Sequence, residues 1–152
     1  MKISFRWLQE LLPTQTSVDD AAAVLTATGL EVEGVEPVED LPGGLRGLVV
    51  GHITACTQHP NADRLQVCLV NVGEPEPLQI VCGANNARSG LDVIVALVGA
   101  QLHPTNGEPF QIKKGKIRGE VSMGMICGED EIGVGSSHDG IIELEDSWTP
   151  GT

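Results

Sequence analysis

The chain has very few aromatic residues and no tyrosine. Aromatic residues make up 3% of its 152 residues, and they are limited to Phe5, Trp7, Phe110 and Trp148. Proteins that bind single-stranded nucleic acid without reading its sequence usually stack the bases on aromatic side chains. The shortage therefore argues against a base-stacking surface, and it requires a core built mainly from valine, isoleucine, leucine and alanine.

Long apolar runs and closely spaced cysteines are also missing. The longest apolar run, residues 93–100, is far too short to span a membrane, and nothing resembles a signal peptide. The four cysteines form no C-x-x-C pair, as a structural zinc site usually would. We therefore predict a cytoplasmic protein without a membrane partner, a metal site or disulfides, in which the four thiols are free and buried. These thiols belong to Cys56, Cys68, Cys82 and Cys127.

Cations are scarce: nine Lys and Arg stand against 21 Asp and Glu, for a net charge of −12. The imbalance is uneven, with −6 in residues 1–40, +1 in residues 41–128 and −7 in residues 129–152. Such a chain is not expected to bind nucleic acid tightly on its own.

Four of the nine cations nevertheless fall within six residues, namely Lys113, Lys114, Lys116 and Arg118. A compact basic strand or turn beside glycines could hold a phosphate backbone. Charged residues on an exposed strand can equally protect a sheet edge from pairing with another chain. Composition alone does not decide between these two interpretations.

Two short helices are expected near the start of the chain. Residues 4–12 place Trp7, Leu8, Leu11 and Leu12 on one apolar stripe. Ser4 is suited to cap this helix and Pro13 to end it. A second helix should follow the capping sequence that begins at Ser17, and Gly29 is suited to end it in a left-handed conformation.

Residues 30–36 alternate between apolar and acidic side chains, which predicts a half-exposed strand. Two short helices and one strand bury little surface, so we interpret residues 1–39 as part of an incomplete α+β domain. Residues 37–44, rich in proline and glycine, are predicted to form a linker.

The remaining residues, 40–152, are predicted to form an all-β domain. Strand patterns occur at residues 48–55, 65–72, 78–82 and 93–97, with one or two more within 112–126 and another at 140–144. Glycine-, proline- and asparagine-rich turns separate these segments. Five or more short strands in about one hundred residues indicate a small barrel or sandwich.

No pattern of residues indicates catalysis. Gly133-Val-Gly135 lacks the third glycine of a dinucleotide-binding loop, and Glu120-Val-Ser-Met-Gly124 lacks the first glycine of a nucleophile elbow. A hydrolase built on Ser136, Ser137 and His138 would have no other support in the sequence.

Three ordered motifs in the all-β region resemble those of EMAP-type tRNA-binding OB domains. The first is His59-Pro-Asn-Ala-Asp-Arg-Leu65, the second is Ile80-Val-Cys-Gly-Ala-Asn-Asn-Ala-Arg-Ser-Gly90, and the third is Ile112-Lys-Lys-Gly-Lys-Ile-Arg-Gly-Glu-Val-Ser-Met-Gly-Met-Ile-Cys127. The beginning of the chain, through Val35, is similar to the N-terminal region of bacterial phenylalanyl-tRNA synthetase β subunits.

This resemblance implies a mainly β fold, in which a five-stranded OB barrel over residues 40–152 is inserted after the small α+β segment. It also implies a fragment of a longer subunit that joins α subunits in an (αβ)₂ tetramer. The whole enzyme would attach phenylalanine to tRNA with ATP and magnesium, whereas this fragment would carry no catalytic group and need no cofactor.

The tRNA contacts implied by the resemblance lie in and around the basic cluster. Phosphate contacts are assigned to Lys113, Lys114, Lys116, Arg118, Arg64 and Arg88. Asn86 and Ser122 would form hydrogen bonds to sugar or base edges, and Gly124 and Met125 would shape the surface. The alternative is an assembly module of the synthetase tetramer that never touches tRNA, which the acidity of the chain and its few aromatic residues favour.

Overall fold

The computed structural model describes residues 1–12, 14–36, 38, 41 and 43–152. The chain divides into two compact units, Met1–Val38 and Glu39–Thr152. Pro13 and half of the predicted linker (37, 39, 40 and 42) lie outside the described residues. None of the helices in the described part of the chain is long and apolar enough to cross a membrane.

The first unit contains the two predicted helices, α1 (Phe5–Leu11) and α2 (Val18–Ala27). Ser4 caps α1, and the Ser17 hydroxyl accepts a hydrogen bond from the Asp20 amide at 3.1 Å at the start of α2. At the end of α2, Gly29 has a φ of +96°, and the Leu30 amide donates to the Leu25 carbonyl. These bonds satisfy some of the backbone polar groups that the helix ends leave free.

The strand predicted for residues 30–36 is wrong, because this segment forms no strand in the structure. Alternating side chains give a strand one apolar face, but a strand also needs a neighbour that pairs with its backbone. No such neighbour exists among the described residues of the first unit. None of their side chains is buried, and Trp7 and Leu11 are exposed to 70% and 79%.

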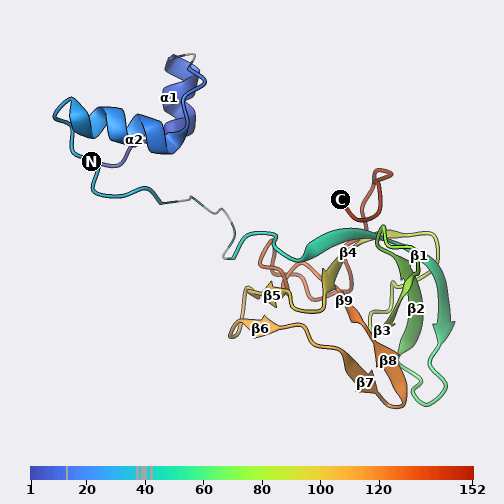
Figure 1. Cartoon of the computed structure of the whole chain (residues 1–152). Coiled ribbons are helices and arrows are strands. Elements are labelled where there is room, and N and C mark those ends of the chain that lie inside the picture. Colours follow the sequence, from blue (N-terminus) through green and yellow to red (C-terminus); the bar gives the residue numbers. More distant parts are fainter. Residues whose placement is uncertain (13, 37, 39–40, 42) are drawn as a thin grey trace. The chain divides into compact units, whose positions relative to one another are not determined.

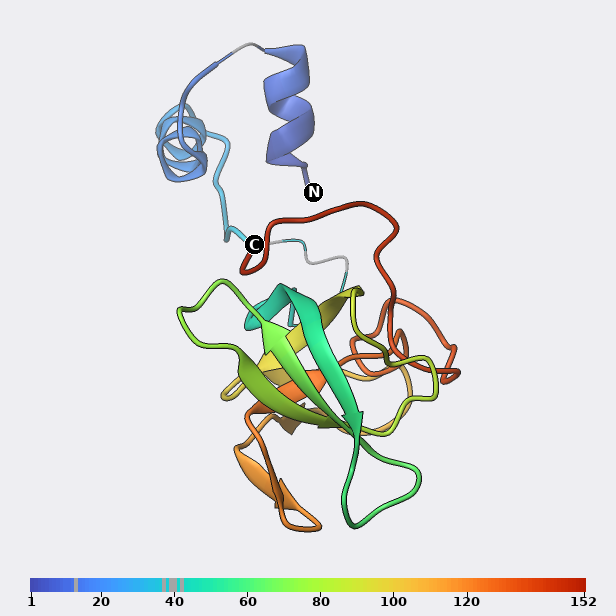
Figure 2. The same ribbon diagram turned by 90° about the vertical axis from the view of Figure 1, so that its right-hand side faces the viewer.

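The second unit is a nearly closed barrel of five antiparallel strands (Figures 1 and 2). The strands follow the order β3-β2-β1-β4-β9, and their bounds are β1 (Leu48–Gln58), β2 (Gln66–Asn71), β3 (Leu78–Cys82), β4 (Asp92–Leu97) and β9 (Gly124–Ile126). This arrangement confirms the predicted mainly β, five-stranded barrel. Long β1 pairs with both β2 and β4, so it belongs to both halves of the barrel.

Two small ribbons are attached to the barrel. One joins β5 (Gln101–Leu102) to β6 (Phe110–Gln111), and the other joins β7 (Gly115–Ile117) to β8 (Glu120–Ser122). The segment 112–126 therefore holds three short strands rather than one or two. The strand predicted at 140–144 is wrong, because this segment makes only a single bridge, between Val93 and Glu143, and adds no strand to the sheet.

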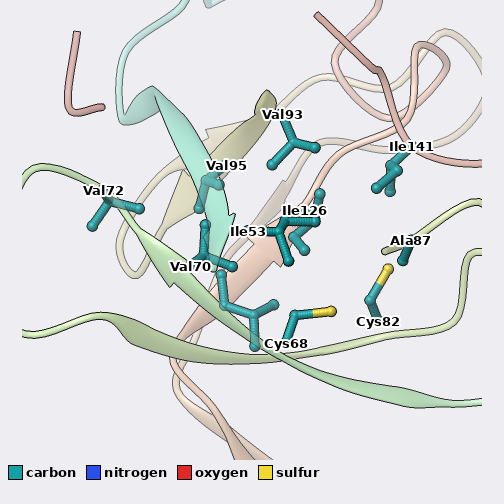
Figure 3. Close-up of a cluster of buried hydrophobic side chains, with 11 residues drawn as sticks. Ile53, Cys68, Val70, Val72, Cys82, Ala87, Val93, Val95, Ile126 and Ile141 are labelled. Atoms are coloured by element: carbon teal, nitrogen blue, oxygen red, sulfur yellow. The ribbon is translucent and has the colours of Figure 1, made fainter. Parts of the chain in front are cut away.

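The core consists of two aliphatic clusters on the two faces of β4. Val93 and Val95 point into the barrel (Figure 3), whereas Ala96 belongs to a second cluster with Leu102 and Ile112. Successive side chains of a strand face opposite sides, so β4 is buried on both sides, and this explains its nearly continuous apolar sequence. All four cysteines are free thiols; three are buried, as predicted, whereas Cys56 is only half-buried.

Candidate nucleic-acid interface

The basic cluster lies in and beside the β7–β8 hairpin. Lys116 pairs with Val121 and Ile117 with Glu120, so Arg118 and Gly119 form the two-residue turn. Both turn residues have positive φ, +48° for Arg118 and +107° for Gly119. This is the pattern of a type I′ turn, whose twist matches that of the two strands it joins.

The hairpin presents its charge to solvent. The Ser122 side chain is buried against β3, and alternation places Lys116 and Val121 on the opposite, outer face of the ribbon. Lys113 and Lys114 precede the ribbon, and all four cations of the cluster are exposed. Within the described part of the chain, none of these four side chains forms an ion pair.

The nearest carboxylate on the ribbon is engaged elsewhere. Glu120 accepts a hydrogen bond from the Gln79 side chain of β3 at 3.1 Å, and the same Gln79 amide donates to the Val121 carbonyl at 2.9 Å. These bonds tie strand β8 of the hairpin to strand β3 of the barrel. The lysine charges therefore remain unpaired, as a phosphate-binding surface requires.

The loop between β1 and β2 holds the tip of the hairpin. The His59 ring accepts from the Asn61 amide through Nδ1 at 3.0 Å and, in that tautomer, donates from Nε2 to the Ile117 carbonyl at 3.0 Å. The Asn61 side chain donates to the Arg118 carbonyl at 3.2 Å. Arg64, exposed and without an ion pair to the described residues, lies on this same loop. The loop that contains Arg64 thus lies beside the β7–β8 hairpin, at the same end of the barrel (Figure 2).

Ser122 and Gly124 have structural tasks. The Ser122 hydroxyl accepts from the Val81 amide at 3.1 Å and donates to the Gly124 carbonyl at 3.0 Å, and the residue is 5% exposed. Gly124 lies so close to β4 that an added Cβ would be 2.8 Å from the Ala96 carbonyl oxygen. Met125 is half-buried against the second core cluster. Because the Ser122 hydroxyl already donates its hydrogen to the Gly124 carbonyl, Ser122 has no free hydrogen for RNA in this conformation.

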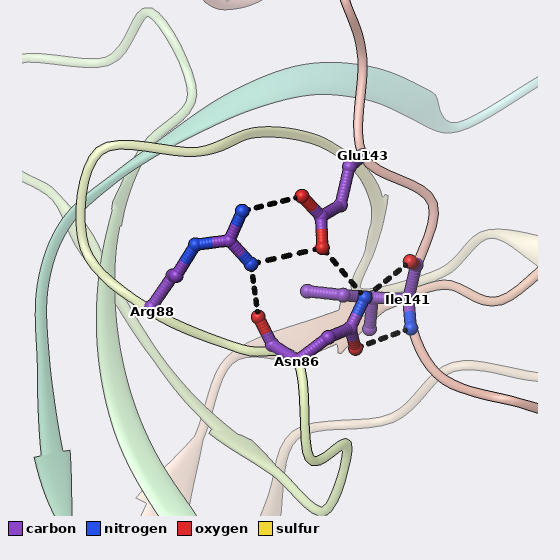
Figure 4. Close-up of polar contacts among 4 residues, drawn as sticks. All are labelled: Asn86, Arg88, Ile141 and Glu143. Atoms are coloured by element: carbon purple, nitrogen blue, oxygen red, sulfur yellow. Dashed lines mark hydrogen bonds and ion pairs between the residues drawn. The ribbon is translucent and has the colours of Figure 1, made fainter.

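Asn86 and Arg88 bind the C-terminal segment instead of the hairpin (Figure 4). The Asn86 amide accepts from the Ile141 amide at 3.0 Å and donates to the Ile141 carbonyl at 2.9 Å, so it pairs with this backbone as a neighbouring strand would. The Arg88 guanidinium makes two hydrogen bonds to Glu143, at 2.9 and 2.7 Å. The Asn86 amide also donates to Glu143 at 3.0 Å. The bonds from Arg88 and then Asn86 lower the pKa of the Glu143 carboxyl. The Arg88 charge is thereby neutralised within the chain.

A pocket of about 540 Å³ lies between the end of β3 and the segment around residues 130–141. Asp130, Glu131 and Asp139 line it, and an acidic lining repels phosphate. Asp130 accepts a hydrogen bond from the exposed His138 ring at 2.8 Å and so raises the pKa of that imidazole. Among the residues that the structure describes, no three histidine, cysteine or acidic side chains come together to hold a metal ion. The pocket is therefore a poor candidate for this interface.

The sequence predicts one interface of Lys113, Lys114, Lys116, Arg118 and Arg64. The structure places the first four in or directly before the β7–β8 hairpin and Arg64 on the loop that bonds to its tip. It places Asn86 and Arg88 on the C-terminal segment and Ser122 in the interior. It also adds His59 and Asn61, which the sequence analysis did not assign to the site. Their signal was present in the His59–Leu65 motif, but nothing in the sequence showed which segment this motif contacts.

Comparisons with known proteins agree with the motifs. A family model described as a putative tRNA binding domain matches residues 48–152. The phenylalanine–tRNA ligase beta subunit of Bacteroides fragilis is 52% identical over 152 residues, which cover 100% of this chain and 18% of that protein. Its counterpart in Porphyromonas gingivalis is 55% identical over 144 residues, covering 95% and 18%. A MetRS-related protein from Pyrococcus horikoshii aligns with a TM-score of 0.49 and 19% identity over 68% of this chain and 84% of that one.

The two ligase subunits are much longer than this chain, which spans about 18% of their length. The resemblance drawn from the motifs, to tRNA-binding OB domains and to this ligase subunit, is confirmed. Because the family model covers most of the chain, the chain belongs to the putative tRNA binding domain family.

Proposed function

We propose that this chain is an accessory tRNA-contacting module of a phenylalanine–tRNA ligase β subunit, and that its β7–β8 hairpin is the contact surface. The observation that carries the proposal is the set of exposed cations on and beside this hairpin, none of which is paired with a described acidic side chain. The tRNA-binding family match over residues 48–152 supports tRNA as the ligand.

The contact is expected to be electrostatic and to discriminate poorly between tRNAs. Lysine and arginine contacts to phosphate position a nucleic acid without reading its bases. The net charge of −12 limits the affinity of the isolated chain, and 3% aromatic content leaves little stacking. We therefore expect weak binding that falls steeply with salt, as counterion release requires.

The test is a titration of fluorescently labelled tRNA with the chain at several salt concentrations. Lys113→Ala/Lys116→Ala should weaken binding and reduce the slope of log K against log salt by about 1.4–1.8, because two phosphate contacts are lost. Lys2→Ala/Arg6→Ala changes the net charge equally, but both residues lie in the first unit and pair with Glu36 and Glu10.

The control pair should keep the wild-type slope. If the two double variants lose the same affinity, the cations act only through total charge and the hairpin is not the interface. Unchanged binding by the hairpin variant would also refute the proposal.

For the longer protein, we propose the chemistry that the relatives' name states, the joining of phenylalanine to its tRNA. ATP, magnesium and the α subunits of an (αβ)₂ tetramer would then be used by parts of the enzyme outside this chain. The module itself would contribute no catalytic group and would work in the cytoplasm, where tRNA is charged.

The second candidate function is assembly of the synthetase. It is favoured by the charge of −7 on residues 129–152 and by the absence of buried side chains among the described residues of the first unit. Deleting residues 40–150 from the full-length subunit distinguishes the two functions. Loss of the tetramer with an unchanged KM for tRNA would support assembly, whereas a raised KM in an intact tetramer would support tRNA contact.

A further inference from the structure

The hairpin that carries the cations has few means of holding its own shape. Each of its strands has three residues, and a two-stranded hairpin alone is at best marginally stable in water. Its turn also places Arg118 at a φ of +48°, which makes Arg118 the one non-glycine residue at positive φ in the described part of the chain. A long side chain is unfavourable there, so the conformation needs support from outside the hairpin.

The β1–β2 loop supplies this support at the turn itself. Two successive carbonyls of the tip are held from the same loop, Ile117 by His59 at 3.0 Å and Arg118 by Asn61 at 3.2 Å. His59 is 3% exposed, and its second ring nitrogen accepts from the Asn61 amide, so both ring nitrogens are used. This fixes the ring orientation, and with it the position of the donor that holds the hairpin.

We infer that His59 and Asn61 are positioning residues for phosphate binding by the hairpin. They hold the backbone between Lys116 and Arg118 in one conformation before any ligand arrives. Without them the tip would adopt other conformations, in which Lys116 and Arg118 reach the phosphates less often, so both the affinity and the number of phosphate contacts would fall. The inference rests on the proposed tRNA contact and adds to it two residues that need not touch tRNA.

Asn61 offers the cleaner test, because it is exposed and its side chain makes a single hydrogen bond, to the Arg118 carbonyl. Removing it should leave the barrel intact. Asn85→Ala is a matched control, because Asn85 is also an exposed loop asparagine and its side chain bonds to no described residue. Urea unfolding of both variants checks that their folds are equally stable.

In the tRNA titration, Asn61→Ala should bind about 3- to 10-fold more weakly than the wild type, with a smaller salt slope, while Asn85→Ala should match the wild type. Hydrogen exchange should be faster at the hairpin amides of Asn61→Ala and unchanged in the barrel strands. A general loss of stability would not lower the salt slope of the folded protein, so the slope separates positioning from simple structural support.

A double-mutant cycle completes the test. In a Lys116→Ala/Arg118→Ala background, Asn61→Ala should have no further effect, because the contacts that it positions are gone. Equal binding by Asn61→Ala and the wild type, or the same loss in both backgrounds, would overturn the inference while the proposed function stands. If the Lys116→Ala/Arg118→Ala background itself binds like the wild type, the proposed interface fails and the inference fails with it.

Discussion

Asn86 is expected to matter for stability rather than for tRNA binding. Its amide group pairs with both backbone polar groups of Ile141, donating to the carbonyl at 2.9 Å and accepting from the amide at 3.0 Å. Ile141 is 8% exposed and belongs to the barrel core. Asn86→Ala would therefore leave two backbone groups without partners where water has little access.

The size of the loss follows mainly from these two bonds, because the third bond of the Asn86 amide, to the exposed Glu143 carboxylate at 3.0 Å, is open to replacement by water. Each contributes about 0.5–1.5 kcal/mol net, and a buried group left without a partner adds a desolvation penalty of about 1–3 kcal/mol. Because Asn86 itself is half-exposed, water can partly replace its amide, so we expect a total of about 2–3 kcal/mol. The midpoint of urea unfolding should fall by about 1–2 M.

The assay is urea unfolding followed by tryptophan fluorescence. A Trp7→Phe background leaves Trp148 as the single tryptophan, and its amide lies 3.4 Å from a carboxylate oxygen of Asp92 at the start of β4, so it reports on the barrel. Asn85→Ala is the control, with no change expected. A loss below about 1 kcal/mol would show that the Asn86 bonds contribute less than the geometry indicates.

The same variant tests the interface. At urea-free conditions, where Asn86→Ala remains folded, its tRNA affinity and salt slope should equal those of the wild type. A smaller slope with a normal unfolding midpoint would instead make Asn86 a ligand contact and would contradict the structural role.

Three further predictions concern the barrel. Gly124→Ala should destabilise it by about 1–3 kcal/mol in urea unfolding, because the new Cβ would be 2.8 Å from the Ala96 carbonyl oxygen; an unchanged midpoint would contradict this close approach. Native protein at about pH 8 should react with iodoacetamide at Cys56 alone. The reason is that burial raises the pKa of the other three thiols, and that of Cys127 to about 12. Labelling of any other cysteine, detected by mass spectrometry, would contradict this prediction. Because the folded pKa of Glu143 is lowered, its contribution to stability is present above its unfolded pKa and is lost as pH falls through the folded value. Glu143→Gln should therefore reduce the stability near pH 7 and flatten its decline from about pH 5 to about pH 3, measured as urea midpoints.

The sequence predicts most of the barrel because its signals are local. Alternating apolar residues and glycine-rich turns mark β1 to β4, and the continuous apolar run at 93–97 marks a strand that is buried on both faces. The helix caps at Ser4 and Ser17 are similarly local, since each bonds an amide three residues away. In each case the residues that cause the structure lie within a few positions of one another, so the sequence alone is enough to predict it.

The two strand predictions that depend on a partner distant in the sequence are wrong. The pattern of residues 30–36 is that of a strand, but no described segment of the first unit pairs with it. The pattern of residues 140–144 is similar, yet the Asn86 side chain bonds the Ile141 backbone, which leaves one bridge instead of a ladder. An alternating pattern predicts which face of a segment is apolar. It does not identify the second segment whose backbone must pair with the first to form a strand.

The same distinction divides the predicted site. A cation in a sequence is equally suited to hold phosphate or to neutralise a carboxylate, and only the fold reveals which carboxylates are near. Arg88 lies 55 positions from Glu143 and is paired with it, whereas Lys116 faces outward and has no described partner. The nearby Glu120 is bonded to Gln79 on the adjacent strand β3 and forms no ion pair with the cluster at 113–118. An interface of this kind depends as much on where the acidic side chains are held as on where the basic ones occur. Gln79→Ala should therefore lower the affinity for tRNA, because the freed Glu120 carboxylate would compete with phosphate for the nearby cations.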